Sequence, residues 1–399
     1  MRIGIYGGTF NPPHLGHIRG AQAAAKALCL DRLLLIPSYI SPHKQLPEHS
    51  PAPCQRLEMV RLAAQGKPEL SVSSMELDRE GTSFTYQTVE QLREQYPEAQ
   101  LFLLMGTDMF LSFLTWREPE RITAQVTLAV MCRGDKGEKE AIAAQKALLE
   151  EKGVRVVLID NPVIDISSTD LRRMLVMDCA SEYLEPAVEQ YIYAHGFYGA
   201  GEDLRGLSVE ELEKAVVRLL KPDRVAHVLG CRQAAVSLAR HYGVDETDAA
   251  RAALLHDITK ALDGPLQLTL CRKYGRILDE FSQANPKTLH ALTGAMVARR
   301  IFGEKEAVVK AIESHTTGKA DMNLLEAIIY VADYMEPNRD FPGVEELRQL
   351  AHADIYMALK RGLEMTLEML HRQGRTVSPG SREALAWLEK KGRKYEKSP

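Results

Sequence analysis

The pattern of residues in this 399-residue chain changes once, near residue 200, and divides the chain into two unlike halves. Before that point, short β-prone runs alternate with helical stretches, which is typical of βαβ units and a parallel sheet. From residue 208 to 370 the periodicity is almost entirely helical, which predicts a helical bundle. Three glycines in the segment 196–201 place the boundary there.

The first half is therefore expected to be an α/β domain with a Rossmann-like parallel sheet over residues 1–198. Helices cover both faces of such a sheet, so its strands should be continuously apolar. A linker over 199–206, an all-α domain over 207–372 and a C-terminal helix with a basic tail over 373–399 should follow. The expected strands are 2–6, 32–36, 101–105, 126–131 and 154–159, and the expected helices are 18–28, 85–96, 207–220, 224–241, 249–261, 287–301, 305–315 and 324–332.

Composition narrows the class of protein. Lys and Arg total 50 against 54 Asp and Glu, and this balance gives no global field for binding nucleic acid or an anionic membrane. The six cysteines form no C-x-x-C pair, so a disulfide framework is not indicated. The N-terminus lacks a signal-peptide pattern, and no apolar run approaches the ~20 residues that span a bilayer. We expect a cytoplasmic enzyme without nucleic-acid or membrane partners; its oligomeric state, including a homo-oligomer, stays open.

The first chemical motif, G-G-T-F-N-P-P-H-L-G-H over residues 7–17, follows the first expected strand. Glycines there let backbone N–H groups approach a phosphate closely. His14 and His17 lie three residues apart at a helix start, so both rings can face one way and stabilise charge developing on a phosphate. A glycine-rich turn with two ordinary histidines is the alternative, and the complete string disfavours it. The candidate substrate contacts before them are Gly7, Gly8, Thr9 and Phe10.

This string resembles the H-x-G-H signature of the nucleotidyltransferase superfamily. Further landmarks over residues 1–198 resemble the bacterial nicotinate-nucleotide adenylyltransferase family. The resemblance implies that the phosphate of nicotinate mononucleotide attacks the α-phosphorus of ATP, giving deamido-NAD and pyrophosphate. These landmarks are Pro42-His43-Lys44, Arg56 with Met59, G-T-S-F-T-Y-Q-T over 81–88, Gly106-Thr107-Asp108-Met109, Trp116 and I-S-S-T-D-L-R over 166–172.

The residues of two landmarks suit phosphate binding on their own. Ser167, Ser168 and Thr169 form a helix N-cap sequence whose free N–H groups suit an anion, and Arg172 adds a positive charge. The loop that carries His43 and Lys44 lies between prolines and can reach phosphates. An ordinary cap and a solvated basic loop are the alternatives.

Two other landmarks suit the nucleosides. Asp108 follows an expected strand that ends at Gly106, which suits a ribose or metal role, and Trp116 can stack on a flat ring. An N-cap and a core tryptophan are the alternatives. The resemblance implies that His14 and His17 stabilise the transferred phosphate, that Mg²⁺ neutralises the triphosphate, and that Thr85 and Trp116 frame the nicotinate ring. It also favours the acid over the amide as acceptor, a choice that the residues alone leave open.

A histidine and aspartate series occupies the helical half. Imidazole and carboxylate are the usual ligands of iron, manganese and similar ions. An aspartate in an apolar helix, such as Asp333, needs a partner or a metal. A single histidine is more often structural, but six such residues in separate helical segments favour a metal site. They are His227, His256, Asp257, His290, His315 and Asp333.

The order H…HD…H…H…D resembles the HD-domain phosphohydrolases. The strings H-D-I-T-K, H-T-T-G, V-A-D-Y and E-P-N-R are similar to a bacterial HD family that splits diadenosine tetraphosphate symmetrically into two ADP. The resemblance implies two ions, iron or manganese, that share Asp257. One ion would take His227, His256 and Asp333, and the other His290 and His315.

The resemblance also implies that Lys260, one helical turn after His256, points to the substrate phosphates. It makes Thr317, Gly318 and Arg339 candidate nucleotide contacts, although a turn and surface charges explain them equally well. Alternatives stay open for both halves. The first half could be another adenylyl- or cytidylyltransferase. The second could act on other nucleotides, or could bind nucleotides as a regulatory module without turnover.

Overall fold

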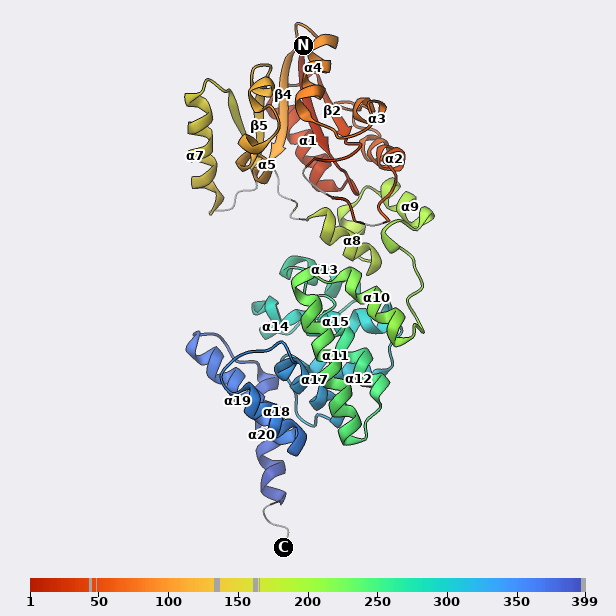
Figure 1. The fold of residues 1–399 in the computed structure, drawn as a ribbon, viewed down its shortest axis with the longest axis vertical. Coiled ribbons are helices and arrows are strands. Elements are labelled where there is room, and N and C mark those ends of the chain that lie inside the picture. The colour runs from red at the N-terminus through yellow and green to blue at the C-terminus, as the bar shows by residue number, and fades with distance from the viewer. Residues whose placement is uncertain (43–44, 48, 133–136, 161–163, 165, 396–399) are drawn as a thin grey trace. The chain divides into compact units, whose positions relative to one another are not determined.

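The computed structural model describes residues 1–42, 45–47, 49–132, 137–160, 164 and 166–395. It consists of two compact units, Met1–Glu202 and Asp203–Pro399 (Figure 1). The division between the units falls within the segment 199–206. Each unit has its own core and is treated by itself below.

The first unit contains a six-stranded sheet in which every paired strand is parallel. The strand order is β3-β2-β1-β4-β5-β6, which confirms the predicted α/β fold with a Rossmann-like sheet. The three-residue strand β3 was not expected, because its sequence L-S-V is too short to give an alternation signal. The strands are β1 (Arg2–Gly8), β2 (Arg32–Pro37), β3 (Leu70–Val72), β4 (Gln100–Gly106), β5 (Val126–Cys132) and β6 (Val156–Asp160).

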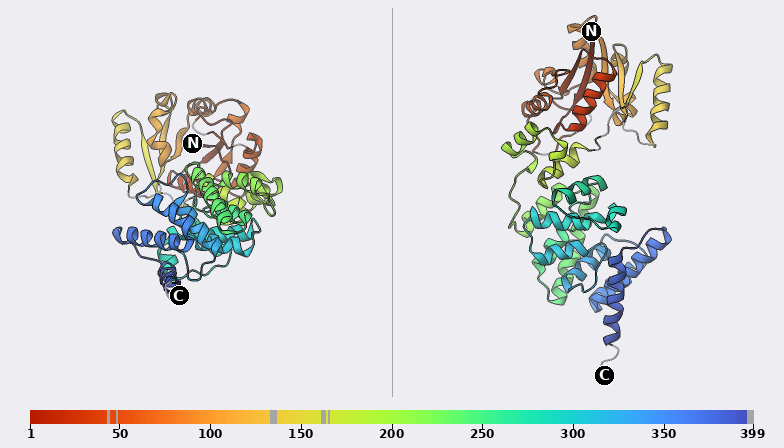
Figure 2. Two further views of the ribbon diagram at one scale, coloured as in Figure 1. Left: turned by 60° about the horizontal axis from the view of Figure 1, so that its bottom comes forward. Right: turned by 180° about the vertical axis from the view of Figure 1, so that it is seen from behind.

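Helices cover both faces of this sheet (Figures 1 and 2). On one face Ile3 and Ile5 of β1 belong to the same buried cluster as Val89 and Leu92 of α4. Helix α1 covers the other face, as the view from behind shows (Figure 2). The helices of this unit are α1 (Leu15–Ala27), α2 (Pro53–Ala64), α3 (Met75–Asp78), α4 (Thr85–Gln95), α5 (Thr107–Leu111), α6 (Pro119–Thr123), α7 (Glu138–Glu151), α8 (Ser168–Val176) and α9 (Pro186–His195), with the 3₁₀ turns η1 (Phe113–Thr115), η2 (Ser181–Tyr183) and η3 (Phe197–Gly199).

The strand order reverses between β1 and β4, which lie side by side from Arg2↔Gln100 to Ile5↔Leu103. The connections that leave their carboxyl ends run in opposite directions, and such a switch point leaves a crevice in open α/β sheets. The loop 9–13 follows β1, and α5 follows β4 directly. The sequence motif of residues 7–17 therefore lies at the point of the sheet where a ligand crevice is expected.

Every secondary-structure element described within residues 203–395 of the second unit is a helix, in agreement with the predicted all-α domain. None of the described helices combines the length and hydropathy needed to cross a membrane. The helices are α10 (Val209–Leu219), α11 (Pro222–Tyr242), α12 (Glu246–Leu255), α13 (Gly264–Lys273), α14 (Glu280–Ala284), α15 (Leu289–Arg300), α16 (Glu306–Ser314), α17 (Leu324–Met335), α18 (Val344–Ala353), α19 (Ile355–Arg372) and α20 (Pro379–Tyr395), with the 3₁₀ turn η4 (Pro286–Thr288).

One helix boundary differs from the expectation in a way that matters for the site. The helix expected over 249–261 ends at Leu255, so His256 and Asp257 do not lie on it and Lys260 is not one helical turn beyond His256. The amides of Ile258 and Lys260 instead bond to carbonyls three residues earlier. This tighter turn brings a continuous run of buried side chains, 256–259, into the interior.

Candidate functional site

A cavity of about 700 Å³ opens at the carboxyl ends of β1 and β4 in the first unit, a volume typical of small-molecule sites. The structure brings together around it every described residue that was predicted to contact substrate or act in catalysis in this half. His43 and Lys44 lie outside the described residues, so their phosphate contacts stay predictions. The lining residues from that set are Gly7, Gly8, Thr9, Phe10, His14, His17, Thr85, Gly106, Asp108, Trp116, Ser167, Ser168, Thr169 and Arg172.

His14 and His17 lie at the start of α1, where His14 is the N-cap residue. Their ring centroids are 3.6 Å apart, so the two imidazoles share one face of the helix as predicted. His17 Nδ1 accepts a hydrogen bond from the backbone N–H of His14 at 3.2 Å. A neutral His17 therefore carries its proton on Nε2 and presents an N–H donor.

The loop 9–13 between β1 and α1 is held by side chains from distant segments. Arg56, on α2, donates to the Thr9 carbonyl at 2.7 Å, and Arg172, on α8, donates to the Asn11 carbonyl at 2.8 Å. Arg172 also donates to Thr169 Oγ1 at 3.0 Å. Arg172, expected as a catalytic residue that holds the triphosphate, thus also fixes the loop beside the two histidines.

Helix α8 begins as the sequence predicted. Ser167 is its N-cap residue, and its Oγ accepts a hydrogen bond from the Asp170 amide at 3.0 Å. Ser168 Oγ donates to the Pro12 carbonyl at 3.3 Å. The N-terminus of α8, with its positive partial charge, therefore faces the same cavity as the histidines.

The candidate ring contacts also line the cavity. Thr85 begins α4, and the half-buried Trp116 packs against Phe113 with ring centroids 5.4 Å apart. Sequence reasoning missed Glu76, a buried carboxyl that lines the same cavity and accepts a hydrogen bond from Thr88 Oγ1 at 2.6 Å. Burial raises the pKa of Glu76. A lone glutamate in a polar stretch gave no signal in the sequence.

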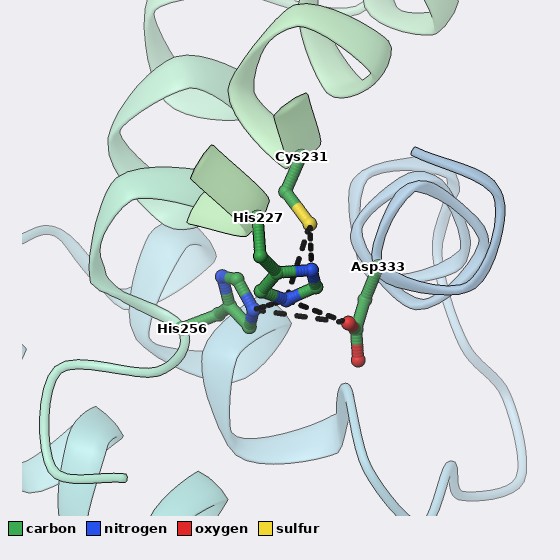
Figure 3. Close-up of side chains that lie close together, drawn as sticks. All are labelled: His227, Cys231, His256 and Asp333. Carbon is green, nitrogen blue, oxygen red and sulfur yellow. Dashed lines mark hydrogen bonds and ion pairs between the residues drawn. The ribbon is translucent and has the colours of Figure 1, made fainter. Parts of the chain in front are cut away.

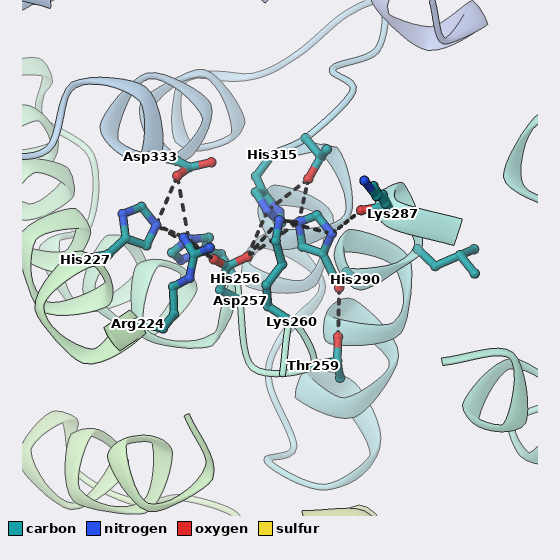
Figure 4. A network of polar contacts seen from close by, with 12 residues as sticks. Arg224, His227, His256, Asp257, Thr259, Lys260, Lys287, His290, His315 and Asp333 are labelled. Atoms are coloured by element: carbon teal, nitrogen blue, oxygen red, sulfur yellow. Dashed lines mark hydrogen bonds and ion pairs between the residues drawn. The ribbon is translucent and has the colours of Figure 1, made fainter. Parts of the chain in front are cut away.

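In the second unit, the four predicted histidines lie close together (Figure 4). The same kind of hydrogen bond orients all four rings. Each donates its Nδ1–H to an oxygen and so directs the Nε2 lone pair inward, which is the usual orientation of metal-binding histidines. The acceptors are Glu336 Oε1 for His227 at 3.2 Å, the Ala253 carbonyl for His256 at 2.7 Å, the Lys287 carbonyl for His290 at 2.9 Å and the Ile312 carbonyl for His315 at 2.6 Å.

The Nε2 atoms gather around two carboxylates. His227 Nε2 lies 3.3 Å from His256 Nε2 and 3.2 Å from Asp333 Oδ1. These three atoms are electron-pair donors in this tautomer, and donors that face one another at such distances are suited to a shared cation. The residues present therefore fit the divalent ion that HD domains imply.

Asp257 lies between the two pairs of histidines. Its Oδ2 is 3.7 Å from His227 Nε2 and 3.6 Å from His256 Nε2. Its Oδ1 is 3.4 Å from His290 Nε2 and 3.8 Å from His315 Nε2. Asp257 thus presents one oxygen to each pair, the arrangement that two ions sharing this carboxylate require.

Cys231 joins this cluster and was missed by sequence reasoning (Figure 3). It lies four residues after His227 on α11 and therefore shares its helix face. Its Sγ is 3.6 Å from His227 Nε2 and 3.9 Å from Nδ1, so the sulfur packs against the ring. Burial raises the pKa of this thiol. The spacing of four residues was the available signal.

Three basic side chains contact the two carboxylates. Lys260 Nζ is 3.8 Å from Asp257 Oδ1, and Arg339 donates to Asp333 Oδ1 at 3.1 Å, as their predicted roles near the site require. Arg224, which was missed, lies 3.5 Å from Asp257 Oδ2. All three side chains are about one-third exposed. The exposed side of the cluster is therefore positively charged and suited to phosphates.

The hydroxyl that contacts the histidines belongs to Thr316. Its Oγ1 lies 3.0 Å from both His290 Nε2 and His315 Nε2. Thr317 and Gly318, the predicted nucleotide contacts, instead lie against α20. Ser381 Oγ donates a hydrogen bond to the Thr317 carbonyl at 2.7 Å. Gly318 lies so near Ala384 that a Cβ added to it would be 3.3 Å from the Ala384 Cβ.

Burial keeps two of the histidines in the neutral form that binds metal. It lowers the pKa of His290 to about 3 and that of His315 to about 4. Burial alone would raise the pKa of Asp333, but the surrounding histidines lower it well below its usual range. At neutral pH, His290 and His315 are therefore neutral and Asp333 is charged.

Comparison with known proteins gives a match for each half. A family model described as "Cytidylyltransferase-like" matches residues 5–174, and one described as "HD domain" matches residues 224–338. The "Probable nicotinate-nucleotide adenylyltransferase" of Thermus thermophilus is 41% identical over 200 residues, which cover 50% of this chain and 100% of that protein. The protein of the same name from Exiguobacterium sibiricum is 36% identical over 199 residues, or 50% of this chain and 99% of that one.

Two solved structures are also similar. A "predicted HD superfamily hydrolase involved in NAD metabolism" from Clostridium acetobutylicum shares 36% identity at a TM-score of 0.45, covering 46% of this chain and 98% of that chain. The Plasmodium falciparum nicotinic acid mononucleotide adenylyltransferase complexed with NaAD shares 19% identity at a TM-score of 0.42, covering 50% and 98%. Through its first half the chain belongs to the nicotinate-nucleotide adenylyltransferase family, and its second half contains an HD domain.

Proposed function

We propose that the first unit transfers the adenylyl group of ATP to nicotinate mononucleotide. An oxygen of the mononucleotide phosphate bonds to the α-phosphorus, the bond between the α- and β-phosphates breaks, and deamido-NAD and pyrophosphate leave. The observation that supports this most strongly is 41% identity along the full length of a relative that bears this name. The cavity agrees with it, because it is lined by the described residues to which this proposal gives a role.

The chain's own residues would act by positioning and electrostatics, as in phosphoryl transfer generally. His17 Nε2–H and the adjacent His14 ring would donate to the oxygens of the transferred phosphate. Arg172 and the N-terminus of α8 would hold the triphosphate. Thr85 and Trp116 would frame the nicotinate ring. Mg²⁺ bound with ATP would neutralise part of the triphosphate charge.

The test is chromatography of products formed by the whole chain from ATP and a panel of acceptors. The panel contains nicotinate mononucleotide, nicotinamide mononucleotide and a phosphorylated acceptor for each alternative transferase. We expect kcat/KM for nicotinate mononucleotide, which gives deamido-NAD, to be at least tenfold higher than kcat/KM for nicotinamide mononucleotide, which gives NAD. A preference for an acceptor without a pyridine ring would replace this proposal with another transferase activity.

We further propose that the second unit is a metal-dependent phosphohydrolase that splits diadenosine tetraphosphate symmetrically into two ADP. The supporting observation is the set of four histidines that direct Nε2 towards Asp257 and Asp333. These six residues would hold iron or manganese. A bound divalent ion polarises phosphoryl oxygens and neutralises the charge that develops on them. Lys260, Arg224 and Arg339 would bind the anionic phosphate chain.

The products decide between the alternatives for this unit. With Mn²⁺ or Fe²⁺ bound, two ADP are expected from each diadenosine tetraphosphate, since water adds to one of the two central phosphorus atoms and its bond to the oxygen that bridges the two central phosphates breaks. ATP plus AMP would place the cleavage elsewhere. No turnover of this substrate, of a cyclic dinucleotide or of a mononucleotide, with the metal measured as bound, would make the unit a nucleotide-binding regulatory module.

A further inference from the structure

We propose that Tyr198, outside the cavity and 187 residues from the motif it contacts, is a positioning residue of the adenylyl-transfer site, an inference that rests on the proposed function of the first unit. Tyr198 belongs to η3 (Phe197–Gly199), near the end of this unit. No sequence motif marks it. Its role follows from what its hydroxyl contacts.

The Tyr198 hydroxyl donates to Asn11 Oδ1 at 2.7 Å. The other end of the same amide, Asn11 Nδ2, donates to Ser50 Oγ at 2.9 Å. Asn11 is buried at 1% exposure and lines the cavity. Because a buried amide must find partners within the protein, these two contacts fix the Asn11 side chain in one orientation.

Tyr198 adds to the contacts that hold the loop 9–13. The carbonyls of this loop accept hydrogen bonds from Arg56, Arg172 and Ser168. The Asn11 side chain bonds to Tyr198 and to Ser50. These contacts come from α2, α8, η3 and the segment that contains Ser50, so several separate segments immobilise one short loop. The loop leads directly into His14, the N-cap of α1. Motion of the loop backbone would therefore also displace the two catalytic histidines.

The backbone around Tyr198 adopts an uncommon conformation to make this contact. Tyr198 has φ 62° and ψ 14°, in the left-handed region that residues with a Cβ rarely occupy. Gly196 and Gly199, on either side, also have positive φ values of 61° and 78°. Such conformations persist only where the surroundings hold them, and they concentrate at functional positions.

The hydroxyl is held in its donor state. Burial raises the pKa of the Tyr198 phenol, although the positive charges of Arg172 and Arg56 oppose this shift. The phenol therefore keeps its proton throughout the ordinary pH range. Asn11 Oδ1 has no proton to give, so Tyr198 is the donor of this bond.

The experiment compares Tyr198→Phe with Tyr193→Phe in the whole chain. Both variants keep the ring and lose the hydrogen bonding of the phenol hydroxyl, which in Tyr193 also reaches the Leu175 carbonyl at 3.3 Å. Tyr193, on α9, donates to Asp178 Oδ1 at 3.1 Å and does not line the cavity, so it is the matched control. Two readouts are measured: amide hydrogen exchange in a peptide spanning residues 8–18, and kcat and KM for adenylyl transfer.

For Tyr198→Phe we expect loop amides to exchange about fivefold faster, the effect of one lost hydrogen bond on local opening. We expect kcat to fall about tenfold, because loosened histidines are misplaced in the transition state. KM for the acceptor mononucleotide should stay within about twofold, since Thr85 and Trp116 are not on this loop. Tyr193→Phe should change none of these values.

Equal exchange of the loop in the two variants would overturn the proposal, and that comparison needs no activity. Faster exchange with an unchanged kcat would also overturn it, by making Tyr198 a purely structural tether. If the wild type formed no deamido-NAD, the proposed function would fail separately. The exchange rates would still show whether Tyr198 holds the loop.

Discussion

The hydrogen bond between Glu336 and His227 should decide how tightly the second unit binds metal. Glu336 is almost fully buried, and its Oε1 accepts from His227 Nδ1 at 3.2 Å. Its other oxygen, Oε2, accepts from the Asn338 backbone amide at 2.7 Å and from Asn338 Nδ2 at 3.0 Å. The change Glu336→Gln keeps the size of the side chain and replaces one acceptor by an NH₂ donor.

A glutamine side chain has one acceptor oxygen, so it can accept hydrogen bonds from Asn338 or from His227 but not from both. Two N–H groups of Asn338 require an acceptor at Oε2, so the amide oxygen takes that position and the NH₂ group faces His227 Nδ1. Nδ1 must then accept, and the proton of a neutral His227 moves to Nε2, the atom that faces Asp333. A proton on Nε2 blocks coordination. Loss of such supporting contacts lowers metal affinity about 10–100-fold, or about 1.4–2.7 kcal/mol.

The assay is titration of the metal-free chain with Mn²⁺ by calorimetry or against a fluorescent chelator. Glu313→Gln is the control, because the Glu313 side chain is exposed and forms a surface ion pair with Arg276. We expect the control to bind as the wild type does. If Glu336→Gln bound Mn²⁺ within about twofold of the wild type while folded by circular dichroism, the inferred tautomer of His227 would be wrong.

Three further predictions concern both units. Gly230→Ala should lower Mn²⁺ affinity in the same titration, because a Cβ there would collide with the Glu336 carboxylate and lie 2.9 Å from Asn338 Nδ2. His17→Ala should lower kcat for adenylyl transfer about 10²–10³-fold in steady-state assays, the usual cost of a lost transition-state donor. For metal-free protein, stability of the second unit should fall as pH drops from 6.5 towards 3. The pKa of His290 is lowered from 6.5 to about 3, so the unfolded state binds more protons in that window. Hydrogen exchange of the α15 amides at pH 7, 6 and 5 would measure this.

Sequence patterns predicted the elements whose signals are local. The runs L-L-L-I and L-F-L-L-M are apolar at every position, and both form strands in the parallel sheet. The start of α8 was equally clear, because Ser167 caps the amide of Asp170 within the same string. The end of helix α12 was predicted six residues too late, since periodicity cannot show where tertiary contacts draw His256 and Asp257 inward.

The candidate site was predicted unevenly for the same reason. Its metal-binding and phosphate-binding candidates lie in short strings with recognisable spacing. Glu336, Arg224 and Tyr198 act through contacts that only the fold creates, and glutamate, arginine and tyrosine are common on protein surfaces. Their functions could not be separated from a surface role without knowing what each side chain touches.

In both units, residues of the candidate sites are therefore held in place by residues that are distant in the sequence. In the first unit a short motif supplies two histidines that would meet the substrate, and in the second unit separate segments supply the candidate ligands. In both units a residue far along the chain holds one of these groups. Tyr198 acts across 187 residues and Glu336 across 109. A segment that kept the H-x-G-H string and α8 but ended before η3 would retain every motif of the transferase and lose one anchor of its loop. Motif content alone is thus a weaker guide to activity than motif content together with these distant contacts.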